Sequence, residues 1–112
     1  MIVQSELRRA LVGIRSQIGR GVRVRDSLIL GADYYETAEE RQQAAAGGLP
    51  AVGIGDEAVV ERAIVDKNAR IGAGVRILNE AGIQEKDGEG YFIREGLVIV
   101  PKNGVLREGT VV

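Results

Sequence analysis

The chain has 112 residues, of which 45% are hydrophobic, and this length supports one domain with its own core but not two. Its formal net charge of −1 gives no field that would favour nucleic acid or an anionic membrane as the main partner, so any anion site must be local. The sequence contains no cysteine and no histidine, which excludes disulfides, zinc–thiolate sites, thiol nucleophiles and Ser–His catalysis.

Residues 1–11 are weakly patterned and are interpreted as a lead-in, with a weak helix candidate that begins at Ser5. Charges at Glu6, Arg8 and Arg9 stand where a signal peptide needs an apolar run. No later stretch approaches the roughly 18 apolar residues of a membrane span. We therefore expect a cytoplasmic protein that contacts no membrane.

Branched apolar residues recur at a spacing of six from residue 12 onward, and we expect them to point inward. This spacing fits neither the 3.6-residue period of a helix nor a long two-residue alternation, and it is typical of a parallel β-helix with hexapeptide-type coils. The members are Val12, Ile18, Val24 and Leu30, then Val65, Ile71 and Ile77, and finally Val100, Leu106 and Val112. The separation of Ile54 and Val65 is one position short of two such steps, so one step between them must be shortened by one. The pattern predicts an all-β fold of about three to four coils within a single domain, residues 1–112.

Residues 32–53 interrupt the spacing and are predicted to form an insertion that contains a short helix. Thr37 and Glu40 match a capping box, and Gly47 or Gly48 would end the helix. Its alanines have high helix propensity but bury little, so we expect the helix to depend on packing against the coils. Asp33 and the two tyrosines after it are interpreted as a turn with an aromatic plug.

Residues 79–90 are polar and rich in glycine, and they predict a second, mobile loop. The two ends of a β-helix expose unpaired backbone unless they are capped, and no capping helix is evident near the C-terminus. We therefore expect an interface at the ends or sides of the coils.

Two Lys-Asn dipeptides stand out among the polar residues. Lys67 and Asn68 are followed by Arg70, and the dipeptide recurs as Lys102 and Asn103, at a separation that we interpret as about two coils. Ammonium, guanidinium and amide groups are donors suited to phosphate or carboxylate. On the residues alone, the interpretation that these cations are solvated outer positions of the coils is favoured. The sequence contains no constellation that indicates a catalytic or a metal site.

A set of motifs spans almost the whole chain: residues 12–16 (VGIRS), 31–37 (GADYYET), 53–55 (GIG), 62–72 (RAIVDKNARIG), 90–93 (GYFI) and 102–112. Together, and in this order, they resemble the C-terminal domain of ADP-glucose pyrophosphorylase (glucose-1-phosphate adenylyltransferase), particularly its cyanobacterial and plant branch. The resemblance implies a left-handed parallel β-helix, an exception to the rule that parallel crossovers are right-handed.

In that family the domain follows a nucleotidyltransferase domain that makes ADP-glucose from ATP and glucose 1-phosphate with magnesium, for glycogen or starch synthesis. The resemblance implies a regulatory and oligomerisation domain that binds a 3-phosphoglycerate-like effector, opposed by phosphate. It places the activator lysines at Lys67 and Lys102. Arg70 is an additional candidate because it is a further cationic donor close to Lys67. The partners it implies are a nucleotidyltransferase domain or subunit and further copies of the chain in a homo-oligomer.

The catalytic residues of the family lie in that other domain, so we expect this chain to be inactive on its own and to use no cofactor. Two alternatives stay open. The first is a purely structural β-helix whose surface cations bind nothing. The second is a hexapeptide-repeat acyltransferase, against which the absence of a histidine general base argues.

Overall fold

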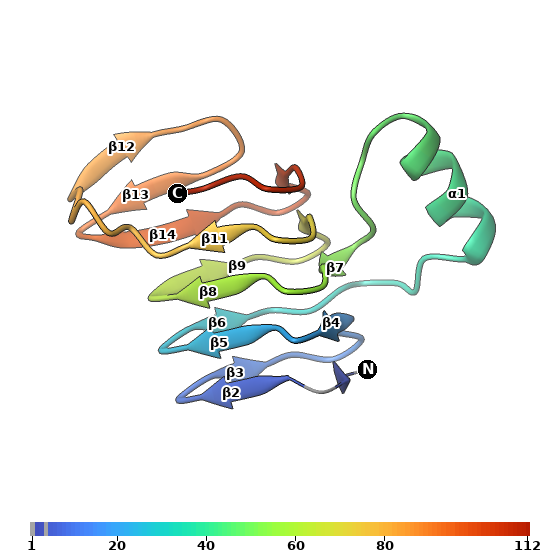
Figure 1. Cartoon of the computed structure of the whole chain (residues 1–112), viewed down its shortest axis with the longest axis horizontal. Helices are drawn as coiled ribbons and strands as arrows, with labels where there is room; N and C mark the ends of the chain where they lie inside the picture. The colour runs from blue at the N-terminus through green and yellow to red at the C-terminus, as the bar shows by residue number, and fades with distance from the viewer. Residues whose placement is uncertain (1, 4) are drawn as a thin grey trace.

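In the computed structural model, which describes residues 2–3 and 5–112, short strands wind into stacked coils (Figure 1). The first coil holds β1 (Ile2–Val3), β2 (Glu6–Arg8) and β3 (Leu11–Val12), and the second holds β4 (Ile18–Arg20), β5 (Arg23–Arg25) and β6 (Leu28–Ile29). After α1 (Ala38–Ala46), the third coil holds β7 (Gly53–Ile54), β8 (Val59–Glu61) and β9 (Ala63–Val65). The fourth holds β10 (Arg70–Ile71), β11 (Arg76–Ile77) and β14 (Leu97–Val100), with β12 (Glu85–Asp87) and β13 (Phe92–Arg94) inserted, and β15 (Val105–Leu106) begins a further turn.

Each coil contributes one strand to each of the sheets, and neighbouring coils pair in parallel. One sheet has the order β1-β4-β7-β10-β15, the second β11-β8-β5-β2, and the third continues from β3, β6, β9 and β14 into β13 and β12. Ile54 lies beside Ile71 and Val60 beside Ile77, so a coil is one position shorter than three full six-residue steps. The predicted all-β class and parallel β-helix are confirmed.

The coil falls short of three full steps because one of its three corners is tight. The inward residues Val24 and Ile29 are one position closer in the chain than a full step, and so are Val60 and Val65. At these corners Asp26 and Arg62 adopt positive φ angles of 51° and 48°, which tightens the turn. The shortened step that the sequence required therefore lies between Val60 and Val65. The expectation that Leu30 points inward was wrong, because Ile29 takes that position and is 4% exposed.

Stacked aliphatic side chains fill the space between the sheets, and they include Val22, Val60, Ile71, Ile77 and Leu106, all almost completely buried. Neighbouring coils approach so closely that the position directly after an inward-pointing isoleucine, Gly55 after Ile54 and Gly72 after Ile71, has room only for glycine. A Cβ atom added to Gly55 would lie 2.6 Å from the backbone nitrogen of Ala73, and one added to Gly72 would overlap the backbone nitrogen of Glu108. These glycines serve close approach, not a positive φ.

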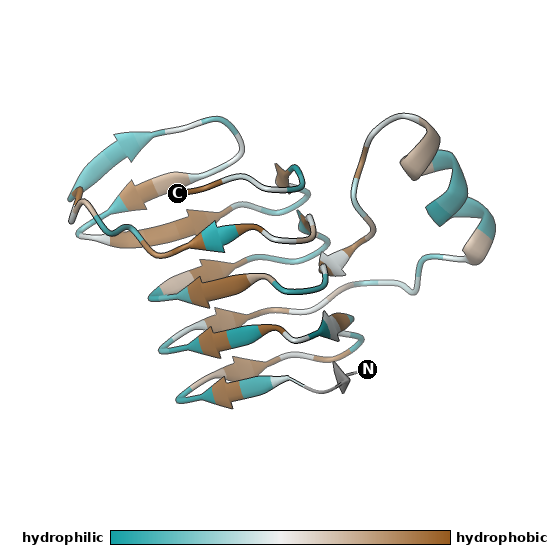
Figure 2. Cartoon of the chain, viewed as in Figure 1, coloured by the Kyte–Doolittle hydropathy of each residue, from teal (hydrophilic) through white to brown (hydrophobic). Residues whose placement is uncertain are grey.

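Residues 32–52 form an arm that leaves the coils after β6 and returns at β7 (Figure 1). Thr37 caps α1, and the reciprocal hydrogen bonds between Thr37 and Glu40 complete the capping box, which confirms the prediction. The helix ends at Ala46, with Gly47 as its cap. The expectation that it packs onto the coils was wrong, because none of its residues is buried and much of it is hydrophilic (Figure 2). The arm is held at its base, and also by a hydrogen bond of 2.6 Å from Arg107 Nη1 on the coils to the carbonyl oxygen of Gly48.

Two segments contain strands that the sequence did not predict. Within residues 79–90, expected to be a loop, β12 pairs in antiparallel fashion with β13, which in turn pairs with β14. Within residues 1–11, expected to be a lead-in, β2 pairs with β5, so this region is a coil and the helix candidate at Ser5 was wrong. Met1 and Gln4 lie outside the described residues.

Candidate functional site

Lys67 and Lys102 project from equivalent turns of neighbouring coils. Val65 of β9 lies beside Val100 of β14, and each lysine follows two residues later. The backbone N–H of Asn103 donates to the carbonyl oxygen of Lys67 over 3.0 Å, which fixes one turn on the other. The interpretation that the dipeptides lie about two coils apart was wrong. They are one coil apart, because the inserted β12–β13 hairpin lengthens the chain between them.

Asp33 lies between the two lysines and pairs with both. Its Oδ1 is 3.3 Å from Lys67 Nζ, and its Oδ2 is 3.5 Å from Lys102 Nζ. Asp33 stands at the root of the arm, one coil before Lys67, so three successive coils meet at this point. Sequence reasoning treated Asp33 as a turn residue and missed this role. The sequence places Asp33 two residues after Gly31, but only the register between the two neighbouring coils shows that it lies opposite the Lys-Asn dipeptide.

Asn68 fixes the position of Asp33. The Asn68 Nδ2 donates to Asp33 Oδ2 over 3.2 Å, and the backbone N–H of Asp33 donates to Asn68 Oδ1 over 2.9 Å. Asn68 is 7% exposed and has a φ angle of 61°, a left-handed conformation that asparagine tolerates better than most residues. Asn103 repeats this conformation with a φ angle of 62°. The asparagine of each dipeptide therefore forms the turn that directs its lysine outward.

The three charged side chains are accessible to solvent, with exposed fractions of 49% for Lys67, 56% for Lys102 and 43% for Asp33. The hydrogen bond from Asn68 lowers the pKa of the Asp33 carboxyl below its ordinary value, and the Lys67 ammonium lowers it further, so Asp33 is ionised at neutral pH. Two ammonium groups therefore face the Asp33 carboxylate, and the Asp66 carboxylate accepts the backbone N–H of Lys67 beside them over 2.7 Å. Ammonium and amide donors converging on one point suit an oxyanion such as a phosphate.

Arg70 does not join the lysine pair. Its Nη1 lies 2.8 Å from Glu36 Oε2 and donates to the carbonyl oxygen of Pro50 over 2.8 Å. The other carboxylate oxygen of Glu36 accepts the backbone N–H of Val52 over 3.0 Å. With exposed fractions of 19% for Arg70 and 5% for Glu36, this pair closes the base of the arm against β10.

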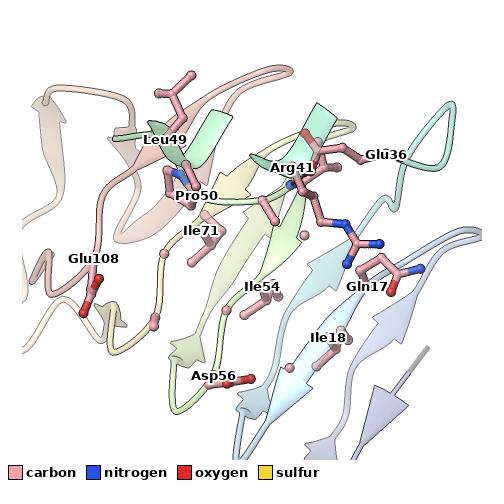
Figure 3. Close-up of a pocket in the computed structure, with 18 of the residues that line it drawn as sticks. Gln17, Ile18, Glu36, Arg41, Leu49, Pro50, Ile54, Asp56, Ile71 and Glu108 are labelled. Carbon is pink, nitrogen blue, oxygen red and sulfur yellow. Dashed lines mark hydrogen bonds between the residues drawn. The ribbon is translucent and has the colours of Figure 1, made fainter. Parts of the chain in front are cut away.

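A cleft of about 960 Å³ separates the arm from the sheet formed by β4, β7 and β10 (Figure 3). Leu49 and Pro50 line it from the arm, and Ile18, Ile54 and Ile71 line it from the coils. The charged residues that line it are of both signs: Arg15, Arg20, Glu36, Arg41, Asp56 and Glu108. Lys67 and Lys102 are not among its lining residues. The lysine pair therefore lies outside this cleft of mixed charge.

Residues 1–111 match the family model described as the GLGC left-handed parallel β-helix domain. The match confirms the resemblance found in the sequence and gives the coils their hand, and the predicted left-handed parallel β-helix is thereby confirmed. In the described part of the chain, no helix is long and apolar enough to span a bilayer.

Proposed function

Because the chain belongs to the GLGC family of left-handed parallel β-helix domains, we propose that it serves as the regulatory and oligomerisation domain of a glucose-1-phosphate adenylyltransferase. In this proposal Lys67 and Lys102 together bind a phosphorylated effector such as 3-phosphoglycerate, with inorganic phosphate as a competitor. The catalytic partner is a nucleotidyltransferase domain or subunit of the same enzyme, and the cell compartment is the cytoplasm.

The convergence of both lysines on one oxyanion position supports effector binding. The Asp33 carboxylate accepts contacts of 3.3 and 3.5 Å from the two Nζ atoms, so the two ammonium groups already straddle a group with two oxygens. A phosphate monoester presents three acceptor oxygens and a charge of about −2 near neutral pH. The same geometry therefore accommodates a phosphate with one oxygen toward each lysine.

Titration of the chain with 3-phosphoglycerate tests the proposal. We expect weak, saturable binding by isothermal calorimetry, and we expect the Lys67→Glu/Lys102→Glu double variant to lose it because two attractive charges become repulsive. Lys86→Glu is the matched control, because Lys86 is also an exposed lysine but lies on β12 over the ring of Tyr91. Equal binding by the double variant and the control would refute the assignment of the lysines.

The same ion pairs favour a second candidate, a purely structural β-helix. If Lys67 and Lys102 serve only to hold Asp33, their ion pairs stabilise the start of the arm, and the lysines bind no external anion. This candidate predicts that 3-phosphoglycerate and phosphate leave the melting temperature unchanged at constant ionic strength, whereas a ligand that binds only the native state raises it.

Among the described residues, the first coil supports the oligomerisation part of the proposal. The strands β1, β2 and β3 each end a sheet, and all belong to the first coil. Nearby, Leu11 and Ile14 are 72% and 70% exposed. Open strand edges and exposed apolar side chains favour association. Sedimentation velocity over a range of concentrations tests this, and we expect Leu11→Lys/Ile14→Lys to shift the chain toward monomer. A purely monomeric unaltered chain at all concentrations would contradict the proposal.

A further inference from the structure

We propose that Asp33 is an internal competitor that occupies the anion position between Lys67 and Lys102 and thereby sets how much charge an external anion must carry to bind there. This inference rests on the proposed function of the lysine pair and concerns how that site selects its ligand. It gives Asp33 the role of a specificity-determining residue.

The geometry carries the inference. The two oxygens of Asp33 divide between the lysines, at 3.3 Å from Lys67 Nζ and 3.5 Å from Lys102 Nζ. Asn68 Nδ2 adds a donor at 3.2 Å from Oδ2. A carboxylate with three donors around it has the same contacts that a bound oxyanion would make. An external anion therefore cannot take this position while Asp33 keeps it.

Two opposing effects decide which anions displace Asp33. The carboxylate is tethered to the coils, so its effective concentration at the lysines is high, on the order of millimolar or more. Each contact, however, is long and exposed to solvent, and exposed ion pairs hold weakly. A free monoanionic carboxylate carries the same charge as Asp33, so it gains no stronger attraction to the lysines. It competes poorly because Asp33 is tethered beside them. A phosphate near charge −2 offers one more acceptor oxygen and nearly twice the charge, so it can displace the resident group.

Asp33 also lies at the root of the arm. Asp33 stands three residues before Glu36, which holds the base of the arm through Arg70 and Val52. The backbone N–H of Asp33 donates to Asn68 Oδ1 over 2.9 Å, and this bond does not involve the carboxylate. An anion that displaces the carboxylate would therefore release one side chain at the arm root without breaking this backbone hydrogen bond.

The test compares inorganic phosphate with acetate on three forms of the full chain: unaltered, Asp33→Asn and Asp26→Asn. Asp26 is the matched control, because it is an exposed carboxylate paired with Arg9 at another corner. We expect Asp33→Asn to bind phosphate at least about fivefold more tightly, since a competing charge a few ångströms away is removed. We also expect it to bind acetate measurably, whereas the unaltered chain and Asp26→Asn do not. Unchanged or weaker phosphate binding by Asp33→Asn would overturn the inference.

A measurement on the unaltered protein does not depend on the folding of any variant. On addition of phosphate, we expect the Asp33 carboxyl carbon resonance to shift together with the Lys67 and Lys102 side-chain resonances. Shifts of the lysines with an unmoved Asp33 would overturn the inference while leaving the proposed function intact. Absence of any shift, together with absence of phosphate binding in Asp33→Asn, would instead refute the proposed function itself.

Discussion

The carboxylate of Glu36 and the guanidinium of Arg70 form a nearly buried ion pair, with Oε2 and Nη1 2.8 Å apart. Glu36 belongs to the outgoing segment of the arm, and Arg70 opens β10 in the fourth coil. Since the same carboxylate also accepts the backbone N–H of Val52 on the returning segment, this one pair joins both ends of the arm to the coils. The helix between those ends buries none of its own residues, and the hydrogen bond from Arg107 Nη1 to the Gly48 carbonyl oxygen is a further attachment of the arm to the coils.

The first prediction follows from that pair. Glu36→Ala leaves the guanidinium of Arg70 with only the Pro50 carbonyl oxygen and removes the acceptor of the Val52 N–H, and we expect a loss of about 2 kcal/mol in the free energy of unfolding. Urea denaturation measures the loss, and faster amide hydrogen exchange in residues 32–52 would place it in the arm. Glu80→Ala, at an exposed turn, is the control and should change little. Equal stability of both variants would show that the arm is held by other contacts.

The second prediction concerns the core. Ile71 is completely buried between the sheets, and Ile71→Ala should lower the free energy of unfolding by about 2 to 5 kcal/mol, through lost burial and the cavity that remains. Ile14→Ala, at a side chain that is 70% exposed, should cost well under about 1 kcal/mol by the same principle of burial. Comparable losses in chemical denaturation would mean that the core is not centred on the stacked inward positions.

The third prediction separates two reasons for glycine. In Gly55→Ala the new Cβ atom would lie 2.6 Å from the backbone nitrogen of Ala73, so neighbouring coils must move apart, and we expect severe destabilisation. In Gly74→Ala the φ angle of 68° is unfavourable but nothing lies within 4 Å, and we expect a cost of only about 1 kcal/mol. Melting temperatures measure both. A larger loss at Gly74 than at Gly55 would contradict the close approach of the coils.

The fourth prediction concerns pH. The hydrogen bond from Asn68 and the neighbouring lysines hold the pKa of Asp33 below its ordinary value of 3.8 in the folded chain. The stabilisation is therefore fully present above the ordinary pKa and is lost as the pH falls through the lowered, folded value. Asp33→Asn should remove this part of the acid dependence and leave stability near neutral pH slightly lower. Melting temperatures from about pH 6 to about pH 2 check it. An identical pH profile for the variant would contradict this linkage.

The sequence alone predicted the local features of this protein. The six-residue spacing of branched residues indicates inward-facing positions, because each coil repeats the same local geometry, and the Thr37–Glu40 capping box was found because both of its partners lie within one turn of helix. The family motifs likewise marked Lys67 and Lys102 as a pair, and the structure brings them one coil apart, while what they bind stays a prediction.

The tertiary structure alone decided which distant residues meet. The lysines became neighbours because the β12–β13 hairpin takes up the extra chain between them, and that hairpin carries no signal in the six-residue spacing. The short corners set the length of each coil and hence the register between coils. This register places Asp33 beside the two lysines and Glu36 beside Arg70. Periodicity depends on each residue's own position in a turn, whereas an ion pair between coils depends on the exact length of every turn and insertion in between.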